Sequence, residues 1–160
     1  MFLKKNMVTL ITSNVNSRDL RKIVNLEREV FKENAFTKHL LKKLIENHTF
    51  FLKLEIGKIK REFIGFIIVI NETKERTNII NYLIKPNFQN SGYGSYLLQH
   101  TINKIKQLKT IKKIVLNVQI SNSIAIKMYE KFKFKRNPSI IKNYYHSGES
   151  AYLMELDIES

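Results

Sequence analysis

Two closely spaced glycines mark the first segment whose residue types could do chemistry, the stretch NFQNSGYG at residues 87–94. Gln89, Gly92 and Gly94 fall between a predicted strand and a predicted helix. Glycine lets the backbone take positive φ and approach a ligand closely, and the unpaired amides and dipole at a helix N-terminus attract anions. The spacing therefore predicts a phosphate or pyrophosphate site, with a simple turn as the alternative. The segment has neither the Gly-Lys-Ser/Thr of a Walker loop nor the G-x-G-x-x-G of a dinucleotide site.

A second candidate segment is LNVQISNSIAIKMYEKFKF, residues 116–134, in which Tyr129 follows Asn122 by seven positions. The pattern predicts a strand followed by a helix that Asn122 could cap and that carries Tyr129. Each residue also has a purely structural interpretation. Asn122 fits a helix cap, and Tyr129 fits a core aromatic because Ile126 and Phe132 lie near it at helical spacing.

The hydrophobic pattern predicts the elements that must position these residues. Apolar residues recur at helical spacing after Ser17 and from Thr37 onward, and Gly57 with Lys58 joins two β-branched runs as a hairpin. Because helices interleave with strands, the predicted class is α/β or α+β. The 160 residues contain no repeat or Pro/Ser-rich linker, so we expect a single domain, residues 1–160. Strands are predicted at residues 7–13 (from Met7), 49–56, 62–71, 79–84, 113–120, 134–141 and 150–158, and helices at 17–31, 37–45, 95–108 and 122–132.

The charge is the most unusual feature of the composition, since 28 Lys plus Arg against 14 Asp plus Glu give +14. Such a charge attracts polyanions in general (nucleic acid, a ribosome surface or a phosphorylated cofactor), or it reflects only a lysine-rich composition. The absence of cysteine excludes disulfides, cysteine nucleophiles and thiolate metal sites. The four histidines lack metal-ligand spacing, so we expect no metal site. With no apolar run as long as a membrane span and no secretory pattern at the start, we expect a cytoplasmic protein without a membrane partner.

The sequence IKP at residues 84–86, followed by Q-x-x-G-x-G at residues 89–94, resembles the cofactor signature of the GNAT acetyltransferases. In that family the signature binds the pyrophosphate of coenzyme A, and Asn90 and Ser91 depart from its usual Arg/Gln and Arg. The resemblance implies acetyl-CoA as the cofactor and the GNAT fold, a mixed, mostly antiparallel sheet of about seven strands with about four helices. It assigns cofactor binding to Tyr82, Leu83, Ile84, Gln89, Asn90, Ser91, Gly92, Tyr93, Gly94, Ser95, Asn122 and Tyr129.

The second segment resembles more closely the N-terminal acetyltransferase branch of that family, which includes bacterial ribosomal-protein alanine acetyltransferases and eukaryotic co-translational enzymes. KNYY at residues 142–145 and GESAYLM at residues 148–154 match the "YY…GEDAxxM" ending of this branch. The resemblance covers roughly residues 78–156. It implies direct transfer of an acetyl group from acetyl-CoA to the α-amino group of protein N-termini, through a tetrahedral intermediate whose oxyanion meets a backbone donor at residues 82–84.

The resemblance to this branch also implies roles for single residues. Tyr129 matches the acid that protonates the departing thiolate, and Asn122 matches the residue that hydrogen-bonds the pantetheine arm. Tyr144 and Tyr145 match a clamp on the first peptide bonds of the substrate, although paired tyrosines in a late strand are equally well one core and one surface residue. Phe31 begins the segment FKENAFT, which lies where the family's substrate loop follows the first helix.

The general base is the point where the pattern breaks, because Asn117 stands where this branch has Glu or His. An amide cannot accept a proton at neutral pH, so Asn117 can at most position a water. Glu33, Tyr82, His146 and a backbone carbonyl remain open as alternatives. Glu33 lies in the predicted substrate loop, where a carboxylate could order water, hold a peptide ammonium group, or simply be solvated.

Three functions remain open: an N-terminal acetyltransferase, a GNAT enzyme acting on a lysine or small-molecule amine, and a basic ribosome- or RNA-binding module that has lost catalysis. The Tyr-Tyr and Gly-Glu-x-Ala elements favour a peptide, and the chain is poor in the acidic residues that a polyamine site needs. No RRM or helix-turn-helix signature is present. The predicted partners are protein N-terminal peptides, with a ribosome or an auxiliary subunit as further candidates.

Overall fold

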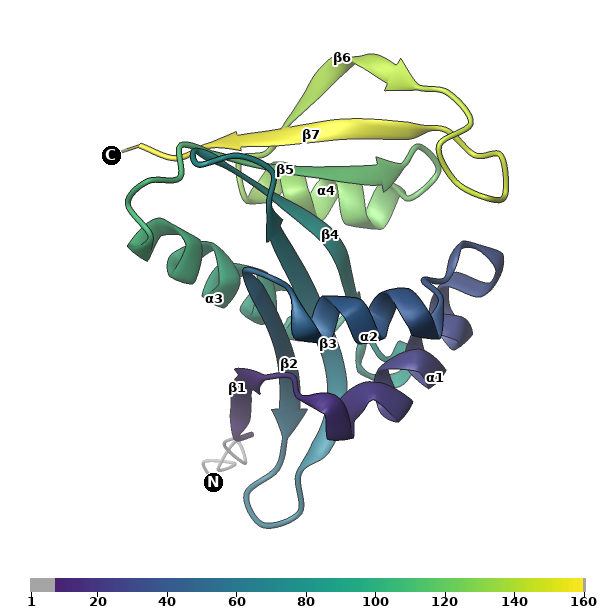
Figure 1. Cartoon of the computed structure of the whole chain (residues 1–160), viewed down its shortest axis with the longest axis vertical. Helices are drawn as coiled ribbons and strands as arrows, with labels where there is room; N and C mark the ends of the chain where they lie inside the picture. The colour runs from purple at the N-terminus through teal and green to yellow at the C-terminus, as the bar shows by residue number, and fades with distance from the viewer. Residues whose placement is uncertain (1–7, 160) are drawn as a thin grey trace, which may run out of the picture.

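One seven-stranded sheet, in the order β1-β2-β3-β4-β5-β7-β6, forms the middle layer of the structure (Figure 1). The structure, a computed structural model, describes residues 8–159. Neighbouring strands are antiparallel except β4 and β5, which run parallel. The strands are β1 (Leu10–Asn14), β2 (Phe50–Ile56), β3 (Glu62–Asn71), β4 (Arg76–Ile84), β5 (Lys113–Gln119), β6 (Lys135–Ile141) and β7 (Ala151–Asp157).

Helices cover both faces of this sheet. The helices α1 (Leu20–Phe31) and α2 (Lys38–Glu46) pack on one face, and α3 (Tyr93–Gln107) and α4 (Ser123–Lys131) pack on the other (Figure 1). Successive side chains of a strand point to opposite faces, so a strand between two helical layers must be apolar throughout. The strand β3 satisfies this requirement, because every residue from 63 to 69 is buried.

Local sequence signals explain where the helices begin. Thr37 caps α2 by accepting a hydrogen bond from the Leu40 N–H at 3.1 Å, as its position in the sequence predicts. Where the first helix was predicted to begin, at Ser17, the chain first forms a 3₁₀ helix (Ser17–Asp19), and the Asn16 side chain caps it in a capping box. The packing of helices on both faces of the sheet therefore follows from caps and apolar stripes that can be recognised in the sequence.

The predicted α/β class and the predicted order of elements are confirmed. Met7, where the first strand was expected to begin, lies outside the described residues. The strand β4 begins at Arg76 rather than Ile79, because its polar first residues pair with β5. The helix α3 begins at Tyr93, two residues before the predicted start at Ser95.

The strands β4 and β5 separate partway along their length, and this separation positions the site. Their pairing runs from Arg76 opposite Lys113 to Ile79 opposite Leu116. Beyond these residues β4 continues to Ile84 and β5 continues to Gln119. Within residues 8–159, the two strands form no further residue pairs with each other. A β-bulge leaves residue 80 unpaired with β3 at the same point. The sheet therefore opens between two strands that both continue.

Candidate active site

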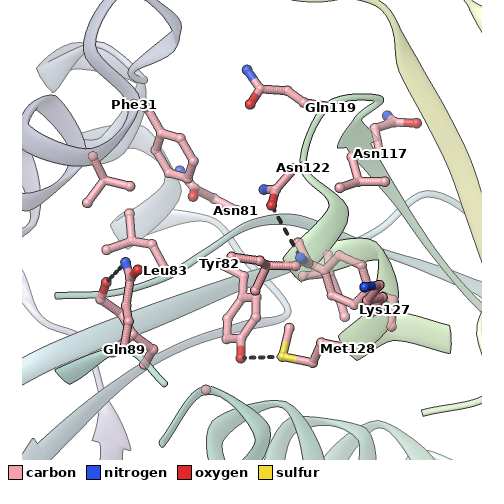
Figure 2. A pocket seen from close by; sticks show the side chains of 18 of the residues that line it. Phe31, Asn81, Tyr82, Leu83, Gln89, Asn117, Gln119, Asn122, Lys127 and Met128 are labelled. Atoms are coloured by element: carbon pink, nitrogen blue, oxygen red, sulfur yellow. Dashed lines mark hydrogen bonds between the residues drawn. The ribbon is translucent and has the colours of Figure 1, made fainter. Parts of the chain in front are cut away.

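A cavity of about 520 Å³ lies where β4 and β5 separate (Figure 2). Its wall includes residues 79–84 of β4 and residues 117–119 of β5, together with parts of α1 and α4. One end reaches the loop before α3, where the phosphate site was predicted, and the other reaches Tyr145 and the segment between α1 and α2. The cavity therefore joins the two segments that the sequence marks as chemically interesting.

The start of α3 is open to this cavity. Its N-cap, Gly92, has φ +84 and provides no side-chain cap, whereas α2 and α4 are capped by Thr37 and Asn122. The first amides of a helix have no partner within the helix, so an uncapped start leaves them available to a ligand. Gly92, Gly94 and Ser95 all line the cavity. This end of the cavity has the donors that a pyrophosphate requires.

Gly94 lies against Tyr82, a tyrosine of β4. A Cβ atom at this position would lie 2.6 Å from the Tyr82 hydroxyl oxygen, which reaches across from β4. The same hydroxyl contacts the Met128 Sδ atom of α4 at 3.6 Å (Figure 2). Burial, followed by the nearby Tyr129, raises the pKa of Tyr82 well above its ordinary value. Tyr82 therefore keeps its proton at neutral pH, which removes it from the candidate bases.

The loop residues predicted to bind phosphate divide into two groups. Gln89 and Asn90 line the cavity, but the Gln89 Nε2 atom donates to the Ile84 carbonyl at 2.9 Å and so holds the loop to the end of β4 (Figure 2). Ser91 and Tyr93 do not line the cavity. The Tyr93 ring packs instead against Phe88, with ring centroids 6.2 Å apart.

Tyr129 is at once a core residue and a cavity residue. It is 7% exposed on α4, and its ring lies 6.4 Å from that of Tyr82 and 5.8 Å from that of Phe134. Burial raises the pKa of Tyr129, and the neighbouring Tyr145 raises it further. The hydroxyl group is therefore protonated at neutral pH and can act as a donor.

Asn122 likewise combines both of its interpretations. Its Oδ1 atom accepts a hydrogen bond from the Ala125 N–H at 3.2 Å and caps α4 (Figure 2). The residue also lines the cavity. Because the oxygen is used by the cap, the amide NH₂ group is the part that can donate to a ligand.

Asn117 lines the cavity from β5, and its Nδ2 atom donates to the Tyr144 hydroxyl at 2.9 Å. Of the two tyrosines predicted to bind substrate, only Tyr145 lines the cavity, while Tyr144 is 48% exposed. The rings meet edge to face at 4.9 Å. Burial is the main cause that raises the pKa of Tyr145, and the charges of Tyr144 and Glu149 add to it. Tyr144 thus contacts the cavity wall through Asn117.

Glu33 does not lie in the cavity, in contrast to the prediction. The chain turns at Lys32, which has φ +50, into a 3₁₀ helix (Lys32–Asn34) on which Glu33 is exposed. Phe31, as predicted for a substrate-binding residue, does line the cavity, and so does Asn34. His146, another candidate base, is exposed and is not part of the wall.

The carboxylate that does line the cavity is Glu27 of α1, which was not among the predicted site residues. It is 1% exposed. Its Oε1 atom accepts from the Phe36 N–H at 2.8 Å, and its Oε2 atom accepts from the Asn81 side chain at 2.8 Å. Desolvation raises the pKa of Glu27 despite both hydrogen bonds. The available signal was an acidic residue at a core position of a helix, where carboxylates are rare.

Two loops from distant parts of the sequence are tied together at the same end of the cavity. The Asn34 Nδ2 atom donates to the Ser147 Oγ atom at 3.2 Å, and the Ser147 N–H donates back to the Asn34 Oδ1 atom at 2.9 Å. The segment between α1 and α2 is thereby bound to the connection between β6 and β7.

Within residues 8–159, no group of three or more His, Asp or Glu side chains is placed to hold a metal ion. In the same part of the chain, no helix combines the length and the apolar character needed to cross a membrane.

Known proteins are similar to this chain in sequence and in fold. The profile of the Acetyltransferase (GNAT) family matches residues 18–134. The N-alpha-acetyltransferase of Sulfolobus acidocaldarius is 26% identical over 147 residues, which cover 85% of this chain and 85% of that protein. The [ribosomal protein bS18]-alanine N-acetyltransferase of Salmonella typhimurium is 32% identical over 87 residues, 52% of this chain and 57% of that protein. The crystal structure of Ard1 from Thermoplasma volcanium superposes with a TM-score of 0.84 at 18% identity, over 94% of this chain and 99% of that one.

Proposed function

The chain belongs to the GNAT acetyltransferase family, and from this premise we propose that it acetylates the α-amino groups of protein N-termini. The name of the Sulfolobus acidocaldarius relative, which matches over most of both chains, supports the α-amino specificity. The main support from the molecule is a single cavity that joins the uncapped start of α3, Tyr129 and the tied loops at Asn34 and Ser147. Such a cavity has one end for an anionic cofactor and one for an acceptor.

Acetyl-CoA is the cofactor of this enzyme, and it supplies the acetyl group as a thioester. The residues at the first end of the cavity fit it. The uncapped amides at Gly92 and beyond suit a pyrophosphate, and the absence of a Cβ at Gly94 leaves room for the Tyr82 side chain beneath the start of α3. We propose that the Asn122 NH₂ group donates to the pantetheine arm, since its oxygen is already used by the helix cap.

Tyr129 is the proposed acid of the reaction. A neutral phenol can protonate a departing thiolate, and the raised pKa of Tyr129 keeps it neutral across the physiological range. Backbone N–H groups at residues 82–84, on the strand edge that has left β5, are the proposed donors to the oxyanion that forms as the amine attacks.

Deprotonation of the amine does not need a strong base. A free α-amino group has a pKa near 8, so a useful fraction is already neutral at physiological pH. We propose that Asn117, held by Tyr144, positions the water that carries the proton to solvent. An amide can orient such a water but cannot keep its proton.

The acceptor end is proposed to bind the first residues of a peptide. Phe31, Phe36 and Tyr145 give it an apolar wall, and the Asn34–Ser147 hydrogen bonds connect the loops on its two sides. The name of the Salmonella typhimurium relative identifies a ribosomal protein as the substrate of that enzyme. For this chain we propose only the wider class, protein N-terminal peptides.

The test compares acceptors by their kcat/KM at saturating acetyl-CoA. The panel contains a short lysine-free peptide with a free N-terminus, the same peptide with its N-terminus blocked and one lysine added, and spermidine. The free N-terminus should be preferred by at least about tenfold, because the other two amines lack a peptide bond next to the reacting nitrogen. A preference for spermidine or for the lysine peptide would reject the proposal.

A further inference from the structure

Two buried polar side chains in the cavity wall have no part in the mechanism above. Glu27 of α1 is 1% exposed and Asn81 of β4 is 7% exposed, and both line the cavity. The Glu27 Oε2 atom accepts from the Asn81 Nδ2 atom at 2.8 Å. The Glu27 Oε1 atom accepts from the Phe36 N–H, also at 2.8 Å. Glu27 therefore links α1, the segment before α2, and β4 at a single point.

This arrangement fixes which way the Asn81 amide faces. A carboxylate only accepts hydrogen bonds, so the NH₂ group of Asn81 must face Glu27 and the Oδ1 atom must face away from it. The Oδ1 atom is buried and has no hydrogen-bond partner among residues 8–159. A buried acceptor without a partner is costly, and in a cavity wall it indicates a donor that arrives with the ligand.

The position of Asn81 indicates which ligand brings that donor. Asn81 follows the bulge at residue 80, beside the point where β4 and β5 separate. Its contact with Glu27 places its side chain on the α1 face of the sheet, where Phe36 and Asn34 form the acceptor end of the cavity. A donor needed on this face belongs to the acceptor substrate, whose reacting group carries N–H bonds.

We propose that the Asn81 Oδ1 atom accepts a hydrogen bond from the α-amino group of the substrate, and that Glu27 is the positioning residue that turns this oxygen toward the amine. This inference rests on the proposed function, because it requires an amine as the acceptor. It also explains how the site can work although position 117 carries an asparagine and not a carboxylate or a histidine. An oriented amide oxygen can bind and direct the amine without taking its proton.

The Glu27→Gln variant tests the orientation without removing the hydrogen bond. A glutamine at position 27 can still accept from the Phe36 N–H, but its NH₂ group then faces Asn81. The Asn81 amide must flip to accept from it, and a donor instead of an acceptor then faces the amine. The kcat/KM for the free N-terminal peptide should fall roughly 10- to 100-fold, the range expected for a charge-assisted or buried hydrogen bond. The Tm should not fall, and the Kd for acetyl-CoA should stay within about twofold.

A double variant provides the matched rescue. In Glu27→Gln/Asn81→Asp the amide and the carboxylate exchange places, so the pair keeps its hydrogen bond and an oxygen faces the cavity again. Activity should return to within about tenfold of the wild type. Glu72→Gln is the control, because Glu72, in the connection before β4, accepts from Asn78 of β4 at 2.6 Å in an exposed carboxylate–asparagine pair outside the cavity. It should leave the kcat/KM unchanged.

The outcomes separate this inference from the proposed function. A wild-type enzyme that does not acetylate peptides overturns both. A wild-type enzyme that acetylates peptides, with Glu27→Gln equally active, overturns the inference alone. If Glu27→Gln loses activity because it binds acetyl-CoA more weakly or because its Tm is lower, the inference is also overturned. The Glu27–Asn81 pair would then serve the cofactor or the fold.

Discussion

At the scale of single residues, the site is dominated by hydroxyl groups that are kept protonated. Burial raises the pKa values of Tyr82, Tyr129 and Tyr145, and Tyr129 and Tyr145 affect their neighbours through charge. Ionising one of them would place a phenolate in a poorly solvated cavity beside another phenol. These side chains can therefore donate protons but cannot serve as bases, which is consistent with Tyr129 as the acid.

Replacing Tyr129 by phenylalanine should lower kcat by about 100-fold, because the ring still packs but the leaving thiolate has no proton donor. The measurement is steady-state kinetics with a free N-terminal peptide, with isothermal titration of coenzyme A as the control for cofactor binding. An unchanged kcat would remove Tyr129 from the mechanism.

Replacing Gly94 by alanine should weaken acetyl-CoA binding, because the new Cβ would lie 2.6 Å from the Tyr82 hydroxyl, and either the tyrosine or the start of α3 must move. Removing that hydroxyl in Gly94→Ala/Tyr82→Phe should restore at least part of the affinity. The Kd for acetyl-CoA of the wild type, the two single variants and the double variant forms a complete cycle. If the second substitution brings no recovery, the contact with Tyr82 is not what requires a glycine at this position.

At the scale of the elements, Glu27 connects α1 to β4 through a buried carboxylate, and this has a consequence for stability. The folded-state pKa of Glu27 lies above the ordinary value of 4.5 because burial disfavours the charged form. The Glu27 carboxylate therefore binds its proton more tightly in the folded state than in the unfolded state. The contribution of this group to the free energy of unfolding is complete below about pH 4.5 and is lost as the pH rises through the raised pKa.

Glu27→Gln should remove this pH dependence. Between about pH 4.5 and pH 7, the free energy of unfolding of the wild type should fall relative to that of the variant, since a glutamine cannot ionise. Urea denaturation across this range measures the difference. Glu29→Gln, an exposed acidic position on the same helix, is the control and should follow the wild type. If the free energies of unfolding of the wild type and of Glu27→Gln change with pH in parallel, the pKa of Glu27 is not raised in the folded state.

Most of the elements could be predicted from the sequence, because apolar periodicity and caps such as Thr37 are local signals. The loop at residues 87–94 and Tyr129 could be singled out from the sequence, because the motifs that resemble the GNAT family each lie within one short segment; their roles stay predictions. The separation of β4 from β5 could not be predicted, because it depends on where two strands stop pairing. Nor could the Asn34–Ser147 hydrogen bonds, whose partners lie 113 residues apart.

Glu27 and Glu33 show the limit of residue type as a signal. Both are acidic and both lie near the predicted substrate loop, and the prediction selected Glu33. The turn at Lys32 leaves Glu33 exposed, while the helical face of α1 carries Glu27 into the cavity. The choice between them required the direction of each side chain, which depends on the packing of α1 against the sheet.

At the scale of the whole molecule, the net charge of +14 creates a field that favours anionic ligands, and acetyl-CoA carries several phosphate charges. Because the chain belongs to the GNAT family, acetyl-CoA is the anionic ligand whose binding this positive field would favour. An additional role of the charge in holding the enzyme near a polyanionic partner such as a ribosome stays a prediction from the composition.

Acetyl-CoA should stabilise the folded protein against heat. At about 100 times the Kd, a ligand specific for the folded state adds about 2.7 kcal/mol, which corresponds to roughly 5–11 °C in Tm for a chain of this size. Differential scanning fluorimetry with acetyl-CoA measures the shift, and adenosine, which lacks the phosphates, is the control. The absence of any shift would contradict the cofactor site at the start of α3.

Mass spectrometry of a single reaction product tests the central claim most directly. The substrate is a peptide with one free α-amino group and one internal lysine, incubated with the enzyme and acetyl-CoA and then fragmented to locate the acetyl group. The account predicts that the acetyl group is found on the α-nitrogen of the first residue while the lysine side chain stays free. Acetylation of the lysine side chain, with the N-terminus unmodified, would contradict it.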